Sequence, residues 1–227
     1  MTKIILVRHC EAQGNFERIF QGHWNGNITD NGKIQLSKLA EKMKDYPFDY
    51  LYSSPLIRAV KTAKACNIYH NKPIGIIRNL IEINGGDWEG KKWADFPALF
   101  PNESKLWTLE PHSFTAPNGE SMIDVYDRIS KTIDMLAKRH EGKTICIASH
   151  GCAIRNYLCY AKGWNIDKLN DVEWCDNTGI SVIEYDDDFV ARLIVENDNS
   201  HIPSDLSTLA KQSWWKKENR DKIIFDK

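Results

Sequence analysis

Short apolar runs alternate with helical patterns along most of this chain, and this alternation limits the possible folds more than any other feature. Each run is short enough for a strand and apolar enough to be at least partly buried. The predicted strands cover residues 3–8, 50–53, 74–80, 144–149, 179–185 and 189–196. Strands that alternate with helices predict an α/β fold, a three-layer sandwich with a mostly parallel central sheet.

The helices between these strands are indicated by capping residues and by apolar side chains at helical spacing. Thr29 or Asp30 would cap the first long helix. Ser54 followed by Pro55 predicts the start of the next one, because proline is favoured at the first helical position. Ser121 would cap a third and longer helix. The order of elements is therefore that of an α/β protein from the first strand onward.

One domain with an insertion is the expected organisation of these 227 residues. Residues 84–120 are rich in Gly, Pro, Trp and Phe and lack clear periodicity, which suggests short helices in an insertion or lid. We expect 1–227 to form a single domain whose tail, from about 203 to 227, is helical at first. The tail carries residues that would cover the pocket or the second subunit of a homodimer: Trp214, Trp215, Lys216 and Lys217. In the alternative interpretation, which we favour, one tryptophan packs and the lysines stay in solvent.

Charge and composition exclude several classes of protein. The 30 Lys and Arg residues against 31 Asp and Glu residues argue against general nucleic-acid binding, which needs a basic excess. No apolar run approaches the ~18 residues of a membrane span, and the run 4–7 is too short for the core of a signal peptide. Six cysteines without a C-x-x-C pair indicate reduced thiols and no zinc site. We therefore expect a cytoplasmic protein with neither a nucleic acid nor a membrane as partner.

Charged side chains follow the predicted strands at the points where these end. Arg8 and His9 close the first strand, and Arg58 lies in the first turn of the helix after the second. Glu82 follows the third strand, and His150 follows the fourth. Ligands of open α/β sheets gather at the carboxyl ends of the strands. Each residue alone would more often be structural, but their convergence on one edge predicts a site.

The chemistry of this set points to phosphate. The planar fork of an arginine fits phosphoryl oxygens, and helix N-terminal amides add further donors. A neutral imidazole can attack phosphorus and split one difficult step into two. A carboxyl group can protonate the departing oxygen and then take a proton from water. The sequence therefore predicts phosphoryl chemistry at this edge of the sheet.

These residues stand in motifs that resemble those of the histidine phosphatase superfamily, also called the phosphoglycerate mutase-like family. The resemblance covers about residues 3–200, and six motifs follow one another in the order of the family. They are Leu6-Val7-Arg8-His9-Cys10-Glu11, Phe20-Gln21-Gly22, Ser53-Ser54-Pro55-Leu56-Ile57-Arg58, Glu82 with Gly86 and Gly90, Pro117-Asn118-Gly119-Glu120-Ser121, and Ser149-His150-Gly151. The tail beyond about 203 lies outside the resemblance.

The resemblance implies a role for each matching residue and a phosphoglycerate mutase-like fold. His9 would be the nucleophile that becomes phosphohistidine, and Glu82 would be the general acid and base. The phosphoryl group would be held by Arg8, Arg58 and His150. Further contacts to phosphate or substrate would come from Asn15, Gln21, Gly22 and Gly151. The resemblance implies no metal and no organic cofactor.

Cys10 departs from the family, which has glycine after the nucleophilic histidine. A side chain there would be expected to crowd the pocket. The pair His9-Cys10 also resembles the start of the protein tyrosine phosphatase loop, in which a cysteine thiolate attacks phosphorus. That loop needs an arginine six residues after its cysteine, and Phe16 stands there. The spacing therefore favours His9 as the nucleophile.

The third motif favours the phosphatase branch over the mutases. In mutases an Arg and a Tyr of this motif help to hold the phosphoglycerate carboxylate, but Ile83 and Gly85 stand there in this chain. We therefore expect a metal-independent phosphatase whose substrate is a small phosphomonoester. Two alternatives stay open, phosphoryl transfer of the phosphoglycerate mutase type and a non-catalytic member that binds phosphorylated ligands.

The identity of the substrate lies outside these motifs. The insertion is expected to roof the site through Lys91, Lys92, Trp93, Trp107, His112 and Phe114. In the alternative interpretation its aromatic side chains pack a small core of their own.

Overall fold

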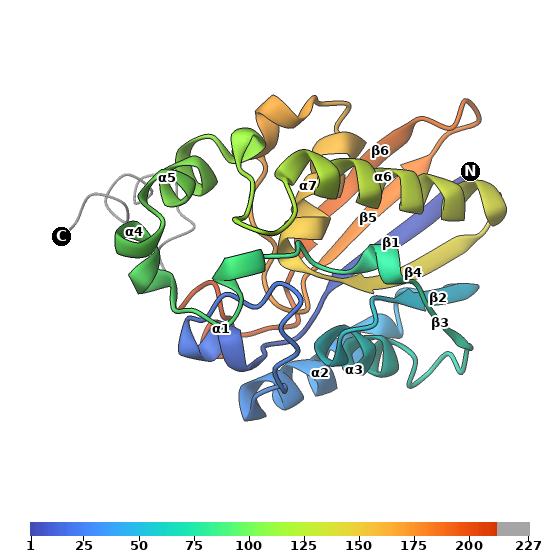
Figure 1. Ribbon diagram of the computed structural model, residues 1–227. Coiled ribbons are helices and arrows are strands. Elements are labelled where there is room, and N and C mark those ends of the chain that lie inside the picture. Colours follow the sequence, from blue (N-terminus) through green and yellow to red (C-terminus); the bar gives the residue numbers. More distant parts are fainter. Residues whose placement is uncertain (213–227) are drawn as a thin grey trace.

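A six-stranded sheet forms the centre of the molecule, in the strand order β3-β2-β4-β1-β5-β6. The structure is a computed structural model that describes residues 1–212, so the predicted Trp-Lys segment at 214–217 lies outside the described residues. The first four strands in that order are parallel, and β5 pairs antiparallel with both β1 and β6. The expected mostly parallel sheet is confirmed (Figure 1).

The strands agree with the alternation of the sequence. Their bounds are β1 Thr2–Arg8, β2 Tyr50–Ser53, β3 Ile74–Ile76, β4 Thr144–Ser149, β5 Ile180–Tyr185 and β6 Ala191–Asp198. Strand β1 is buried between β4 and β5, which explains its continuous apolar run. Its parallel register with β4 places Arg8 opposite Ser149, so the ends of these two strands meet at one edge.

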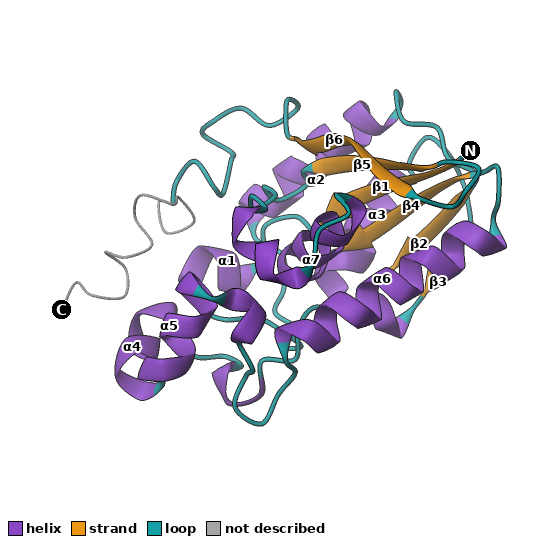
Figure 2. Ribbon diagram, turned by 90° about the horizontal axis from the view of Figure 1, so that it is seen from above, coloured by secondary structure: helices purple, strands orange, loops and turns teal. Residues whose placement is uncertain are grey.

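Helices cover both faces of the sheet and complete the predicted sandwich (Figure 2). The helices α2 and α3 lie on one face, and α6 and α7 lie on the other. The helical bounds are α1 Gln13–Glu17, α2 Asp30–Met43, α3 Ile57–Cys66, α4 Phe96–Leu99, α5 Pro101–Leu109, α6 Met122–Arg139 and α7 Gly151–Ala161. Thr29 and Ser121 cap α2 and α6 with their hydroxyl groups, as predicted.

The insertion at 84–120 consists of short helices, as predicted. It holds α4, α5 and single 3₁₀ turns, and it lies near α1 at the end of the molecule where β1 finishes (Figure 1). Its aromatic side chains are packed together, and the ring centroids of Trp88 and Phe96 are 4.1 Å apart. Trp88, Phe96 and Phe114 are fully buried in the larger of the two cores. The insertion therefore rests on an aromatic core that is continuous with the core under α6 and α7.

Three predicted elements have wrong boundaries. Strand β6 covers residues 191–198 rather than 189–196. Helix α3 begins at Ile57 rather than at Ser54-Pro55, because the Ser54 hydroxyl is bound to His150 and Leu56 takes the capping position. The third strand ends at Ile76, where its pairing with β2 ends, and a 3₁₀ turn replaces the predicted continuation to residue 80.

The described part of the tail is also not helical. Residues 203–212 form successive turns that are closed by local hydrogen bonds, such as those from the amides of Leu206 and Ser207 to the carbonyl of Pro203. The hydroxyl groups of Ser207 and Thr208 and the amide of Leu209 bind buried carboxylates. Among residues 1–212, none of the helices has the length and apolar content that crossing a membrane requires.

Candidate active site

A cavity of about 90 Å³ lies at the carboxyl edge of the parallel strands. Eight of the nine predicted site residues line it: Arg8, His9, Asn15, Gln21, Gly22, Arg58, Glu82 and Gly151. The ninth, His150, is completely buried, and its ring centroid is 5.2 Å from that of His9. The topology thus brings together all the residues that the strand ends predicted.

His9 follows the last residue of β1 and is only 3% exposed. Its Nδ1 lies 2.7 Å from the carbonyl oxygen of Cys10. Because a carbonyl can only accept, Nδ1 carries the proton and Nε2 holds the free lone pair. Burial, followed by the charges of Arg58 and Arg8, holds the pKa of this imidazole well below its usual value. His9 is therefore neutral near pH 7 and can act as a nucleophile.

Arg8 ends β1 with its guanidinium at the cavity. Its Nη1 donates to the carbonyl of Cys175 at 2.5 Å, while its buried Nε has no partner among the described residues. Gly151 begins α7 beside it, and a Cβ at that position would come within 3.2 Å of Arg8 Nε. The glycine lets the helix N-terminus approach the arginine, so backbone amides and a guanidinium face the same space.

Arg58 reaches the cavity from the first turn of α3 and is 1% exposed. Its Nη2 donates to the carbonyl of Gly22 at 2.7 Å, and its Nη1 donates to that of Trp24 at 2.9 Å. Burial lowers the pKa of Arg58 to about 10, so the group stays charged at neutral pH. The Nε is buried without a partner in the described chain. The guanidinium is thus fixed by two carbonyls and keeps a donor for an anion.

His150 lies behind His9 as the residue before α7. Its Nε2 is 2.6 Å from the hydroxyl of Ser54, and its buried Nδ1 has no partner within residues 1–212. If the hydroxyl donates to Nε2, the proton sits on Nδ1 and is a free donor. Burial, then the charge of Arg58, lowers the pKa of His150 well below its usual value. His150 is therefore a neutral hydrogen-bonding group next to the ring of His9.

Glu82 follows the turn after β3 and places its carboxylate at the N-terminus of α7. Its Oε2 accepts from the amide of Cys152 at 3.0 Å, and its Oε1 accepts from the amides of Ala153 and Ile83 at 3.0 and 2.9 Å. Helix N-terminal amides favour a negative group at this position. The carboxylate is therefore held in one orientation at the cavity wall.

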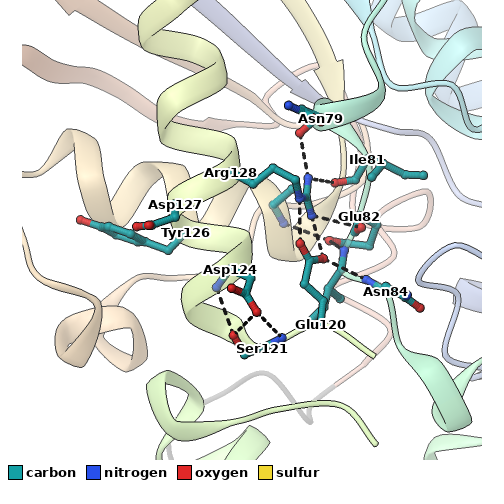
Figure 3. A network of polar contacts seen from close by, with 12 residues as sticks. Asn79, Ile81, Glu82, Asn84, Glu120, Ser121, Asp124, Tyr126, Asp127 and Arg128 are labelled. Atoms are coloured by element: carbon teal, nitrogen blue, oxygen red, sulfur yellow. Dashed lines mark hydrogen bonds and ion pairs between the residues drawn. The ribbon is translucent and has the colours of Figure 1, made fainter. Parts of the chain in front are cut away.

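The backbone around Glu82 is fixed from outside the cavity by Arg128 of α6 (Figure 3). Arg128 forms a two-fold ion pair with Glu120, at 2.8 and 2.9 Å. It also donates to the carbonyls of Asn79 and Ile81 at 2.8 and 2.9 Å, and to that of Glu82 at 3.4 Å. One side chain therefore ties down successive peptide groups on the segment that carries Glu82.

The remaining predicted contacts lie on α1 and on the loop that follows it. The Oδ1 of Asn15 accepts from the amide of Ala12, which leaves its NH₂ group for other contacts. Gln21 is 9% exposed, and its Oε1 has no partner in the described residues. Gly22 has a φ of +34°, and a Cβ there would collide with the carboxylate of Glu89. Glycine is therefore required at the turn that places its carbonyl on Arg58.

Cys10 is completely buried but does not line the cavity, so the expected crowding of the pocket is wrong. Its amide donates to the hydroxyl of Thr62 on α3 at 3.0 Å. Burial raises the pKa of the Cys10 thiol to about 12, so a thiolate is disfavoured at neutral pH. Both observations argue against a cysteine nucleophile.

Several cavity residues were not found from the sequence. The wall includes Arg18, Trp174, Thr208, Leu209 and Gln212. Leu209 and its neighbours come from the tail, which carries no family motif. The sequence signal was indirect. Glu11 of the first motif is buried in the structure, and its Oε2 accepts from the hydroxyl of Thr208 at 3.0 Å.

A second buried carboxylate holds the tail in place. Asp176 is fully buried, and it accepts from the hydroxyl of Ser207 at 2.5 Å and from the amide of Leu209 at 3.2 Å. The next residue, Asn177, donates to the carbonyl of His9 at 2.7 Å. The loop after α7 therefore connects the tail to the backbone at His9.

The insertion contributes fewer contacts than expected. Trp93 and Trp107 line the cavity, whereas Phe114 is buried in the core below it. Lys91, Lys92 and His112 are not among the lining residues. Both expectations for the insertion thus hold in part, since its aromatic residues form a core and two of them also face the cavity. Within residues 1–212, no three His, Cys, Asp or Glu side chains are grouped as a metal site requires.

A cavity with arginines and neutral histidines at the edge of a mostly parallel sheet is typical of an α/β protein that binds phosphorylated small molecules. The comparison with protein families names that class more closely. The chain belongs to the histidine phosphatase superfamily, because residues 4–198 match the model of its branch 1.

Individual relatives are more distant. The chain is 32% identical over 192 residues to phosphoserine phosphatase 1 of Hydrogenobacter thermophilus, a match that covers 82% of this chain and 88% of the relative. Its fold is similar to that of YhfR from Bacillus stearothermophilus, with a TM-score of 0.85, 29% identity, and coverage of 89% and 100% of the two chains. A mutant phosphoserine phosphatase from Entamoeba histolytica, solved with phosphoserine, matches with a TM-score of 0.78, 28% identity and the same coverage.

Proposed function

We propose that this protein is a phosphatase that hydrolyses small phosphomonoesters through a phosphohistidine on His9. The observation that carries the proposal is the state of His9, a neutral imidazole with its lone pair on Nε2 between two fixed arginines. Such a nitrogen can attack phosphorus without first losing a proton. Arg8 and Arg58 offer the charge that stabilises the phosphoryl oxygens as their negative charge is redistributed.

In the first step, the lone pair of His9 Nε2 forms a bond to phosphorus, and the bond from phosphorus to the ester oxygen breaks. The ester oxygen takes a proton from the carboxyl group of Glu82 and leaves as an alcohol. The position of this carboxyl at the α7 N-terminus, beside Arg8 and His9 in the cavity lining, supports this role.

In the second step, water attacks phosphorus on the phosphohistidine. The Glu82 carboxylate takes a proton from that water, and the bond from phosphorus to Nε2 breaks. Inorganic phosphate leaves, and His9 returns to its neutral form. His150 and the amides at the start of α7 supply hydrogen bonds to the phosphoryl oxygens in both steps.

Hydrolysis is favoured over mutase chemistry by the cavity wall. Ile83 is 1% exposed and lines the cavity where a mutase would place an arginine. A Cβ on Gly85 would meet the ring of Phe20 at 2.2 Å, so a tyrosine cannot stand there in this conformation. Two relatives named above are phosphoserine phosphatases, and one was solved with phosphoserine, so phosphoserine is the first substrate to test.

The unpaired state of the cysteines is typical of a protein in a reducing compartment. All six cysteines are free and buried, as is usual for proteins of the cytoplasm, and we propose that compartment for this enzyme.

The proposed intermediate can be trapped. Incubation with ³²P-labelled substrate, followed by rapid denaturation, should leave a label on the protein that is stable in alkali and lost in acid. His9→Ala should abolish both the label and detectable turnover, and EDTA should leave the turnover of the wild type unchanged. Turnover without a label on the wild type, or a label that persists in His9→Ala, contradicts the mechanism.

A further inference from the structure

The charges on the cavity lining are not balanced. The lining residues of the described chain include three arginines, Arg8, Arg18 and Arg58, and a single carboxylate, that of Glu82. The proposed phosphatase mechanism uses Arg8 and Arg58 for the phosphoryl group. Arg18 is left over, and its guanidinium forms no hydrogen bond or ion pair with any other residue that the structure describes.

The backbone of Arg18 is held in place at the cavity. It follows α1 with a φ of 59°, a left-handed conformation that few non-glycine residues adopt, and its amide donates to the carbonyl of Gly14. Its own carbonyl accepts from the amide of Trp93 at 3.0 Å. Two residues on, the amide of Phe20 donates to the carbonyl of Lys91 at 2.9 Å. The segment at 18–20 is therefore fixed between α1 and the insertion.

The surroundings of Arg18 differ from those of the two phosphate arginines. The other wall residues are mainly apolar, with Trp93, Trp107, Trp174 and Leu209 among them. Partial burial lowers the pKa of Arg18, yet an arginine remains charged at neutral pH. Arg18 is thus an exposed cation on the lining of a cavity that already has a phosphate site, and this position favours a ligand with a second negative group.

We propose that Arg18 binds a second anionic group of the substrate, and that the preferred substrates are phosphomonoesters of small hydroxy acids, which carry a free carboxylate. The inference rests on the proposed phosphatase function and narrows its substrate class. A guanidinium binds a carboxylate through parallel hydrogen bonds. Gln21, with a buried and unpartnered Oε1 on the same lining, accepts from an amino or hydroxyl group beside that carboxylate.

Pairs of esters that differ only in the carboxylate test this. O-phosphoserine is compared with O-phosphoethanolamine, and 3-phosphoglycerate with glycerol 3-phosphate, in the wild type and in Arg18→Ala. Losing a charged hydrogen bond corresponds to about a 10-fold to 100-fold change. We expect Arg18→Ala to lower kcat/KM on the carboxylate ester by that factor relative to the paired ester without the carboxylate. Most of this loss should come from a higher KM.

Arg139→Ala is the matched control. Arg139 is an exposed residue in the last turn of α6, at the opposite end of the sheet from the cavity. Its replacement by alanine removes one positive charge, as Arg18→Ala does. The ratio of kcat/KM on the carboxylate ester to kcat/KM on its paired ester should be the same in Arg139→Ala as in the wild type. An Arg18→Ala variant that lowers both esters equally, or a wild type without preference for the carboxylate ester, overturns the proposal.

Failure of the phosphatase function itself is seen separately. Hydrolysis of p-nitrophenyl phosphate by the wild type reports on the phosphatase chemistry without a carboxylate. Calorimetric binding of each ester pair to His9→Ala, with and without Arg18→Ala, needs no turnover. Weaker binding of only the carboxylate ligands in the double variant supports Arg18 as the anion site even for a non-catalytic protein, and equal binding refutes it.

Discussion

The floor and the wall of the cavity are built in different ways. The floor consists of Arg8, His9 and Arg58 on the lining, together with the buried His150, and the wall consists of Arg18, Trp93, Trp107, Trp174 and Leu209. The floor residues lie at strand ends or at the starts of α3 and α7, and the backbone or Ser54 fixes each of them. The wall residues belong to the insertion and to loops, and the rings of Trp93 and Trp174 both pack against that of Trp107.

This difference separates two tasks. Floor groups fixed by carbonyls are already aimed before a substrate arrives, and such preorganisation is what stabilises a transition state. A wall of packed side chains sets the shape and charge that the rest of the substrate meets, and so influences which substrate binds. Floor variants should therefore lower the rate on every substrate, whereas wall variants should change the ranking of substrates.

Among the variants that should keep measurable activity, the largest effect is expected for Arg58→Ala. It removes a charged donor aimed at the phosphoryl group, and kcat/KM should fall by about 10²–10⁴ on all substrates alike. Arg58→Lys should keep only part of the activity, because lysine lacks the planar guanidinium that binds the carbonyls of both Gly22 and Trp24. Steady-state kinetics on an aryl and an alkyl ester check both, and near-normal activity of Arg58→Ala removes it from the floor.

Glu82→Gln should have a smaller and substrate-dependent effect. An alkyl leaving group needs protonation more than an aryl one, so kcat on alkyl phosphates should fall by about 10²–10³ and on p-nitrophenyl phosphate by much less. Arg128→Ala should show a weaker form of the same selectivity, because it loosens the segment that carries Glu82.

Tyr185→Phe is the control for these two variants. It removes the hydrogen bonds of the Tyr185 hydroxyl to Asp134 and Tyr157, below α6 and far along the chain from Glu82. It should lower the melting temperature and leave the ratio of alkyl to aryl rates unchanged. If Arg128→Ala behaves like this control, Arg128 only stabilises the fold.

Trp107→Leu should sharpen the distinction between floor and wall. It removes aromatic surface from the cavity and from the contacts with Phe114 and Trp93. We expect KM to rise by about tenfold for a preferred metabolite, with kcat much less affected, since the floor is untouched. A panel of phosphorylated metabolites should show a changed order of preference, and an equal loss on all members would assign Trp107 to the floor.

The smallest effect is expected for Cys10→Ser, although Cys10 is next to the nucleophile. Its side chain is buried away from the cavity, and serine is nearly isosteric. Activity should stay within about threefold, or ~0.6 kcal/mol. Loss of the phosphoenzyme label in Cys10→Ser, with a label retained in His9→Ala, would reverse the assignment of the nucleophile.

Most of the floor was predictable from the sequence, and most of the wall was not. Of the floor, Arg8, His9 and His150 stand at or directly after the ends of predicted strands, and Glu82 beside the floor follows the third strand closely. The edge where parallel strands end is common to all of them. The start of α3 was misplaced because the Ser54 hydroxyl serves His150 in space rather than capping the helix. Local capping rules cannot see a partner that is 96 residues away.

The sequence by itself determined the class of fold, the identity of the floor residues and the chemistry they suggest, because strand alternation and residue type are local properties. Only the tertiary structure decided the tautomer of His9, the inward fold of the tail at Leu209 and the unpaired charge of Arg18. The tautomer depends on how the backbone turns after β1, which places the carbonyl of Cys10 on His9 Nδ1. The other two depend on the packing of segments far apart in the chain, such as the binding of Ser207 to Asp176. Burial and charge balance are sums over such contacts, and no single stretch of sequence contains them.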